Sequence, residues 1–91
     1  MWIKIVGLPS PKSQQALLNA QAAASMFDER PKVRWYNDIH VMIKLGMMHT
    51  PTVIVNGRVM SAGRVPSVYE MECWIDDQLK SALVETEEIA A

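Results

Sequence analysis

Apolar positions along the 91-residue chain change their spacing several times, and each change predicts a new element. Four short runs are apolar, β-branched or alternating, as is typical of strands. Three longer stretches carry apolar residues three or four positions apart, as on one face of a helix. The predicted elements, in chain order, are a strand at 2–6, a helix at 11–27, a strand at 32–36, a helix from 38 to about 45, strands at 52–55 and 58–62, and a helix from 67 to about 83.

Serine marks the predicted start of both long helices. Ser10 is a suitable N-cap, and Pro11 fits the first helical position because its missing N–H would be unpaired there. Ser67 and Glu70 have the spacing of a capping box, in which the serine hydroxyl accepts a free N–H and the glutamate reaches back.

The most specific local signal lies between the third and fourth predicted strands. Pro51 directly precedes the β-branched run 52–55, and it opens this strand because proline cannot donate to a central ladder. Asn56 and Gly57 follow, and this pair favours a type I′ turn with positive φ at both residues. The segment predicts a tight β-hairpin.

The order β-α-β-α-β-β-α predicts an α/β domain with one mixed, four-stranded sheet and helices on both faces. No repeat or linker divides the chain, so we expect a single domain at 1–83. Residues 84–91 contain several glutamates and are expected to form an acidic, frayed tail.

Composition and charge exclude several classes of function. Nine basic and ten acidic residues give a net charge of −1, which argues against a broad nucleic-acid surface. No apolar run approaches the ~20 residues that a membrane span requires. The alternating start, 1–6, is too short for a signal-peptide core, so we expect a cytoplasmic protein.

The residue types that bind metals are sparse. Cys73 is the only cysteine, which rules out an internal disulfide and a cysteine-based zinc cluster. His40 and His49 are far apart in sequence and make a poor metal site. We therefore expect no metal and no cofactor, and we expect Cys73 to be an inert thiol.

The element order and the segment 50–57, followed by 61–64, resemble the thioredoxin/glutaredoxin superfamily. The similarity covers residues 2 to about 82 and is greatest to small thioredoxin-like proteins described as redox-active disulfide proteins. The resemblance implies a thioredoxin-like fold in which the Thr50–Pro51 bond is cis and its loop faces the start of the first helix. It also implies a redox motif of two cysteines, separated by two residues, at that helix.

The resemblance places the redox motif on Ser10-Pro11-Lys12-Ser13, so serine stands at both cysteine positions. A helix N-terminus favours a thiolate, which is the attacking species in disulfide exchange. A serine hydroxyl titrates far above a thiol, forms no disulfide and has no adjacent base in this motif. The chain as written is therefore expected to be redox-inactive. Either the serines replace the cysteines of an active parent, or they are native to an inactive member.

By resemblance, the catalytic positions are Ser10 and Ser13, where the first cysteine would attack a substrate disulfide and the second would resolve the mixed disulfide. The resemblance also implies a substrate groove formed by a further set of residues: Pro11, Lys12, His49, Thr50, Pro51 and Thr52.

Simpler interpretations stay open for several residues. Ser10 also fits plain helix capping, and Lys12 and Arg64 also fit solvated surface charges. Met47 and Met48 fit either core packing or an adaptable rim beside the groove.

The resemblance implies as partners a disulfide-containing protein or a thioredoxin-reductase-like protein, with no nucleic acid and no membrane, and the chain is expected to be monomeric. The alternative function is a non-catalytic module that uses the same groove to hold a peptide.

Overall fold

The computed structural model describes residues 1–44, 46 and 49–90, with 82–90 described by their backbone. Its elements follow the predicted order β-α-β-α-β-β-α, and all four strands have the predicted bounds. In chain order they are β1 (Trp2–Val6), α1 (Pro11–Ala24), β2 (Lys32–Tyr36), α2 (Ile39–Lys44), β3 (Thr52–Val55), β4 (Arg58–Ala62) and α3 (Val68–Ala90).

The strands form one mixed sheet in the order β2-β1-β3-β4. Strand β1 pairs in parallel with β2 and antiparallel with β3, while β3 and β4 form the antiparallel hairpin. At the hairpin turn, φ is 51° at Asn56 and 82° at Gly57, as a type I′ turn requires. The four-stranded α/β fold and its hairpin are therefore confirmed.

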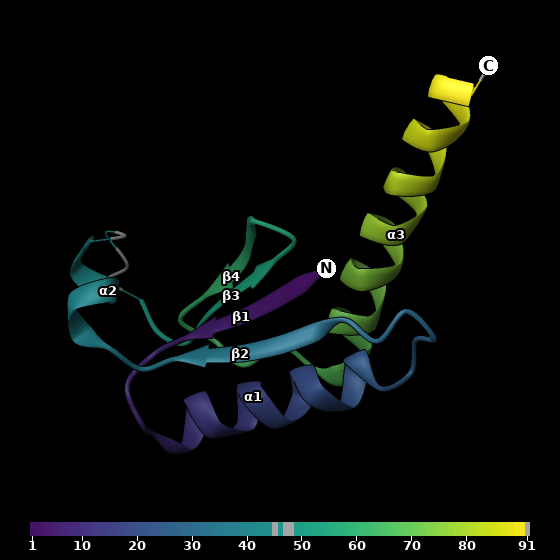
Figure 1. Cartoon of the computed structure of the whole chain (residues 1–91). Coiled ribbons are helices and arrows are strands. Elements are labelled where there is room, and N and C mark those ends of the chain that lie inside the picture. Colours follow the sequence, from purple (N-terminus) through teal and green to yellow (C-terminus); the bar gives the residue numbers. More distant parts are fainter. Residues whose placement is uncertain (45, 47–48, 91) are drawn as a thin grey trace.

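The core lies between one face of the sheet and the helices α1 and α3. It contains buried residues from both central strands and both helices: Ile3, Ile5, Val53, Val55, Ala16, Ala20, Ala23, Ala24, Met71 and Ile75. Because α1 contributes only alanines to this set, its backbone can approach the sheet and α3 closely. Figure 1 shows α1 running alongside the sheet and α3 rising from the same layer.

The helices cover the two faces of the sheet unequally. Helix α2 has no buried residue and lies beyond one end of the strands (Figure 1). It reaches the second face of the sheet through Val41, which lines a hollow there together with residues of the strands. Much of that second face is left open.

The ends of α1 and α3 differ from the expected positions. Helix α1 ends at Ala24 instead of Phe27, and the amides of Met26 and Phe27 donate to the carbonyls three residues earlier. The hydroxyl of Ser25 donates to the carbonyl of Ala22 at 2.7 Å, and such a bond competes with the helical pattern. At α2, Asp38 accepts from the N–H of His40 at 2.8 Å, and the expected end at Leu45 lies outside the described residues.

Helix α3 is longer than expected, because its backbone is helical through Ala90. Glutamate and alanine, which are frequent after residue 83, are among the stronger helix formers. We expected an acidic, frayed tail at residues 84–91, and its backbone is helical through Ala90. The domain boundary at residue 83 remains a prediction. Among the described residues, no helix combines the length and apolar character that crossing a membrane needs.

Candidate functional site

The candidate site forms where the turn after β1 passes between the start of α1 and the loop before β3. At the centre of this contact is Gly7, which is buried. A Cβ atom on Gly7 would lie 2.6 Å from the Oγ of Ser13, 3.4 Å from the Cβ of Thr50 and 3.6 Å from the Cα of Pro51. Gly7 therefore brings these three residues together, and the absence of a side chain there is what allows their close approach.

The backbone of Gly7 is held on both sides. Its N–H donates to the carbonyl of Tyr36 at 2.9 Å, and its carbonyl accepts from the Nε1 of Trp35 at 2.8 Å. Both partners belong to β2, so the sheet fixes the turn that leads into α1.

The two serines lie at the first turn of α1 and contact each other. Ser10 is the N-cap, with extended backbone angles, and its Oγ accepts from the N–H of Ser13 at 3.1 Å. The same oxygen donates to the Oγ of Ser13, also at 3.1 Å. Ser13 is buried, with 1% of its surface exposed, whereas Ser10 is only half-buried. One position is thus open to solvent while the other is covered.

The loop of His49 to Thr52, called the proline loop below, lies opposite the start of α1 at the site. The Thr50–Pro51 peptide bond is cis, and Pro51 and Thr52 are buried. The hydroxyl of Thr52 donates to the carbonyl of His49 at 2.6 Å, while the carbonyl of Pro51 accepts from the N–H of Gly63 at 3.0 Å. These bonds fix the loop to its own strand and to the segment that follows β4.

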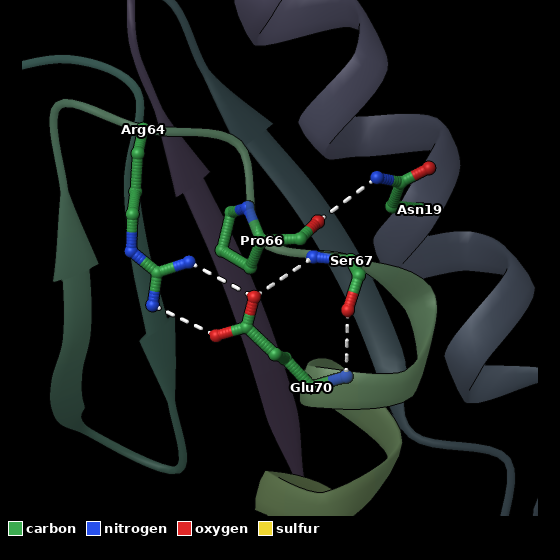
Figure 2. A network of polar contacts seen from close by, with 5 residues as sticks. All are labelled: Asn19, Arg64, Pro66, Ser67 and Glu70. Atoms are coloured by element: carbon green, nitrogen blue, oxygen red, sulfur yellow. Dashed lines mark hydrogen bonds and ion pairs between the residues drawn. The ribbon is translucent and has the colours of Figure 1, made fainter.

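A network of polar contacts holds the segment between β4 and α3 (Figure 2). Arg64 donates to both carboxylate oxygens of Glu70, at 3.0 and 2.8 Å. Glu70 also accepts from the N–H of Ser67 at 3.3 Å, and the Oγ of Ser67 accepts from the N–H of Glu70 at 3.1 Å. The predicted capping box of Ser67 and Glu70 is therefore confirmed, and the exposed Arg64 forms an ion pair with its glutamate.

The same segment is joined to α1, because the Nδ2 of Asn19 donates to the carbonyl of Pro66 at 2.9 Å (Figure 2). The hydrogen bonds from Arg64 hold the pKa of Glu70 below its ordinary value, and the carboxylate raises the pKa of Arg64. The loop beside Gly63 is thus supported by a charged pair at the start of α3.

The predicted site residues divide into two groups. Ser13, Thr50 and Pro51 meet around Gly7, and Ser10 joins them through Ser13. Pro11, Lys12 and His49 are exposed, at the outer side of the same two segments. Met47 and Met48, which fit either core packing or a rim beside the groove, lie outside the described residues.

Sequence reasoning missed the roles of Gly7, Trp35 and Gly63. For Gly7 a local signal exists, because a glycine between a strand and a serine-capped helix indicates a close approach of the backbone. The bonds to Trp35 and Gly63 join positions far apart in the chain, and no local pattern indicates them.

The two serines of this site are not activated for catalysis. In the described part of the chain, the hydroxyls of Ser10 and Ser13 bond to each other and to a backbone N–H, and neither contacts a histidine or a carboxylate. A serine nucleophile requires such a base. The described residues also contain no group of three or more His, Cys, Asp or Glu side chains placed to hold a metal ion. Cys73 is exposed on α3, where it raises the pKa of the neighbouring Tyr69.

A family model described as a thioredoxin domain matches residues 1–76, which include every residue of this site. Neither the curated proteins nor the solved structures gave a significant match. The chain belongs to the thioredoxin-domain family, and its α/β fold is thioredoxin-like.

Proposed function

We propose that the chain is a thiol–disulfide oxidoreductase domain in a redox-inactive form, with Ser10 and Ser13 at the two positions where the reactive cysteines act. The observation that carries the proposal is the contact of 3.1 Å between the two hydroxyl oxygens at the start of α1, beside the loop of Pro51. Disulfide exchange requires two side chains at this proximity, one accessible and one able to reach it.

The chemistry follows when sulfur stands at both positions. A thiolate at position 10 attacks one sulfur of a substrate disulfide, forming a mixed disulfide and expelling the other substrate sulfur as a thiolate. A thiolate at position 13 then attacks the sulfur at position 10, which releases the second substrate sulfur. The substrate gains two electrons, the protein keeps an internal disulfide, and an external dithiol reduces that disulfide.

The site favours this chemistry electrostatically. The first turn of α1 contains no acidic residue, so the positive end of the helix is free to stabilise a thiolate at position 10. Lys12, exposed in the same turn, adds positive charge beside it.

Substrate binding would use the proline loop. The backbone of Thr50, next to the buried Pro51 and Thr52, would pair with an extended segment of a partner protein, as a short added strand does. His49, Pro11 and Lys12 are exposed at the rim of this groove, where they can contact the segment. The expected cytoplasmic location and monomeric state remain predictions.

The test is the double substitution Ser10→Cys with Ser13→Cys in a Cys73→Ser background, which leaves only the two new thiols. With dithiothreitol as reductant, this variant should reduce a disulfide-bonded protein such as insulin faster than dithiothreitol alone. The single variant Ser10→Cys is the matched control: it should form a mixed disulfide with the substrate but not turn over. A double variant that folds and adds nothing to the rate of dithiothreitol would refute the proposal.

A second candidate is a binding module without redox chemistry. The hydroxyls of Ser10 and Ser13 bond to each other and not to a base, so neither is activated as a nucleophile. This observation favours a groove that binds a peptide without reacting with it. The unaltered chain would bind the reduced and the oxidised form of a peptide equally well, whereas an oxidoreductase site should favour the disulfide form.

A further inference from the structure

The face of the sheet opposite the core is positively charged. Every charged residue within the four strands is basic, and these residues are Lys4, Lys32, Arg34 and Arg58. Side chains alternate along a strand, so Lys4 projects opposite to the buried Ile3 and Ile5. The parallel register pairs Lys4 with Arg34 and Trp2 with Lys32, which places three cations on one surface.

Two aromatic rings lie between these cations. The Nζ of Lys32 is 5.3 Å from the ring centre of Trp2, and the Nζ of Lys4 is 5.9 Å from that of Tyr36. The guanidinium of Arg34 is 5.0 Å from the ring centre of Tyr36. In the described part of the chain, no carboxylate lies within ion-pair distance of the three cations.

A hollow of about 440 Å³ adjoins the cations. Its lining comes from all four strands, the hairpin turn and α2, and consists of Lys4, Val6, Tyr36, Val41, Ile54, Gly57 and Val59. Lys4 is the single charged residue of this lining, so the hollow is apolar with one positive edge. Val59 is exposed over 60% of its surface, and Trp2 over 43%.

We propose that this surface, the basic sheet face, binds an acidic polypeptide segment that carries a large apolar side chain. The basic sheet face consists of Lys4, Lys32 and Arg34, the rings of Trp2 and Tyr36, and the adjoining hollow. The apolar side chain occupies the hollow, which has the volume of a small-ligand site. Carboxylates on either side of it pair with the cations, which lack such partners within the described residues.

The observations favour an acidic polypeptide over single-stranded nucleic acid. Binding of bases would need the ring faces of Trp2 and Tyr36 for stacking, and the protein's own cations lie over both rings. The hollow suits an aliphatic or aromatic side chain. It does not suit a nucleotide phosphate, because Lys4 is the one charged residue of its lining.

The basic sheet face lies across the sheet from α1, and none of the residues Ser10, Ser13, Thr50 or Pro51 lines its hollow. Binding there is therefore independent of the redox proposal. A variant with cysteines restored at the serine positions should keep this binding unchanged whether or not it gains reductase activity.

The test measures fluorescence anisotropy of a fluorescein-labelled peptide made of glutamates around a central phenylalanine. The full chain should bind it with an affinity that falls as salt rises. Arg34→Glu should weaken binding at least about tenfold, because it replaces a partner charge with a repelling one. The matched control is Lys80→Glu on α3, which changes the net charge equally and should alter the affinity less than about twofold, since the charge lies away from the surface.

A second pair of variants tests the hollow. Val59→Thr keeps the shape of the side chain but makes it polar, and it should weaken binding of the phenylalanine peptide about threefold. A peptide with alanine in place of phenylalanine should be insensitive to this substitution. The proposal is overturned by absence of peptide binding, by equal effects of Arg34→Glu and Lys80→Glu, or by tighter binding of an oligothymidylate, which would assign the surface to single-stranded nucleic acid.

Discussion

The two long helices begin with the same kind of N-cap but differ in the side chain three residues after it. In each, a serine N-cap accepts the N–H of the residue three positions later at 3.1 Å, from Ser13 to Ser10 in α1 and from Glu70 to Ser67 in α3. In α3 the third residue is a glutamate that reaches back to the N–H of Ser67 and pairs with Arg64. In α1 it is a serine whose hydroxyl meets the hydroxyl of the cap instead.

This difference changes the charge and the burial of the two helix starts. The carboxylate of Glu70 compensates the positive end of α3 and is itself partly exposed, with 38% of its side-chain surface accessible. The first turn of α1 has no acid, and Ser13 is buried against Gly7. The positive end of α3 therefore has a carboxylate beside it, whereas the positive end of α1 has none.

The largest expected effect comes from giving α1 the glutamate of α3. Ser13→Glu should lower the free energy of unfolding by about 3–5 kcal/mol, because the site has no room for the longer side chain and no partner for a buried charge. Ser13→Ala is the control and should cost far less. Urea denaturation measures both. A glutamate tolerated at position 13 would show that the two helix starts are equivalent and that burial does not distinguish them.

A smaller effect is expected from removing the feature that the helix starts share. Ser10→Ala and Ser67→Ala should each lower the free energy of unfolding by about 1 kcal/mol, because each removes an N-cap bond of equal length. The measurement is again urea denaturation of the two variants side by side. If Ser10→Ala were neutral while Ser67→Ala was costly, the hydroxyl of Ser10 would not be acting as a cap.

The smallest effect concerns pH and belongs to α3 alone. Because Arg64 lowers the pKa of Glu70 in the folded protein, this carboxylate stabilises the fold above its ordinary pKa of 4.5. That contribution is lost as the pH falls through the lowered folded-state pKa. It should be small, since the pair is exposed and screened by salt.

The pH effect can be measured from urea midpoints at about pH 6 and about pH 3. The difference in stability between the unaltered protein and Glu70→Gln should shrink toward the lower pH. Parallel losses in the two proteins would show that this ion pair contributes nothing measurable.

The features that could be predicted from the sequence are those that depend on residues close together in the chain. The four strand ranges, the Asn56-Gly57 turn and the capping box of Ser67 and Glu70 agree with the structure. The end of α1 could not be placed from periodicity alone, because the hydroxyl of Ser25 competes locally with the helical pattern.

For the site, the sequence indicated both walls but not what joins them. The resemblance implied a site at Ser10 and Pro51, yet the contact of both segments with Gly7 depends on how β1 pairs with its neighbours. Arg64 looked like a solvated charge because its partner Glu70 is brought near by the turn into α3.

The sequence by itself determined the element order, the helix caps and the hairpin, since each depends on residue type and short spacing. Tertiary structure decided the close approach at Gly7, the burial of Ser13 but not Ser10, and the gathering of three cations on one open face of the sheet. These features require strands and helices distant in sequence to pack in a particular register. The physical reason is that burial and charge density are properties of neighbours in space, which a linear pattern does not contain.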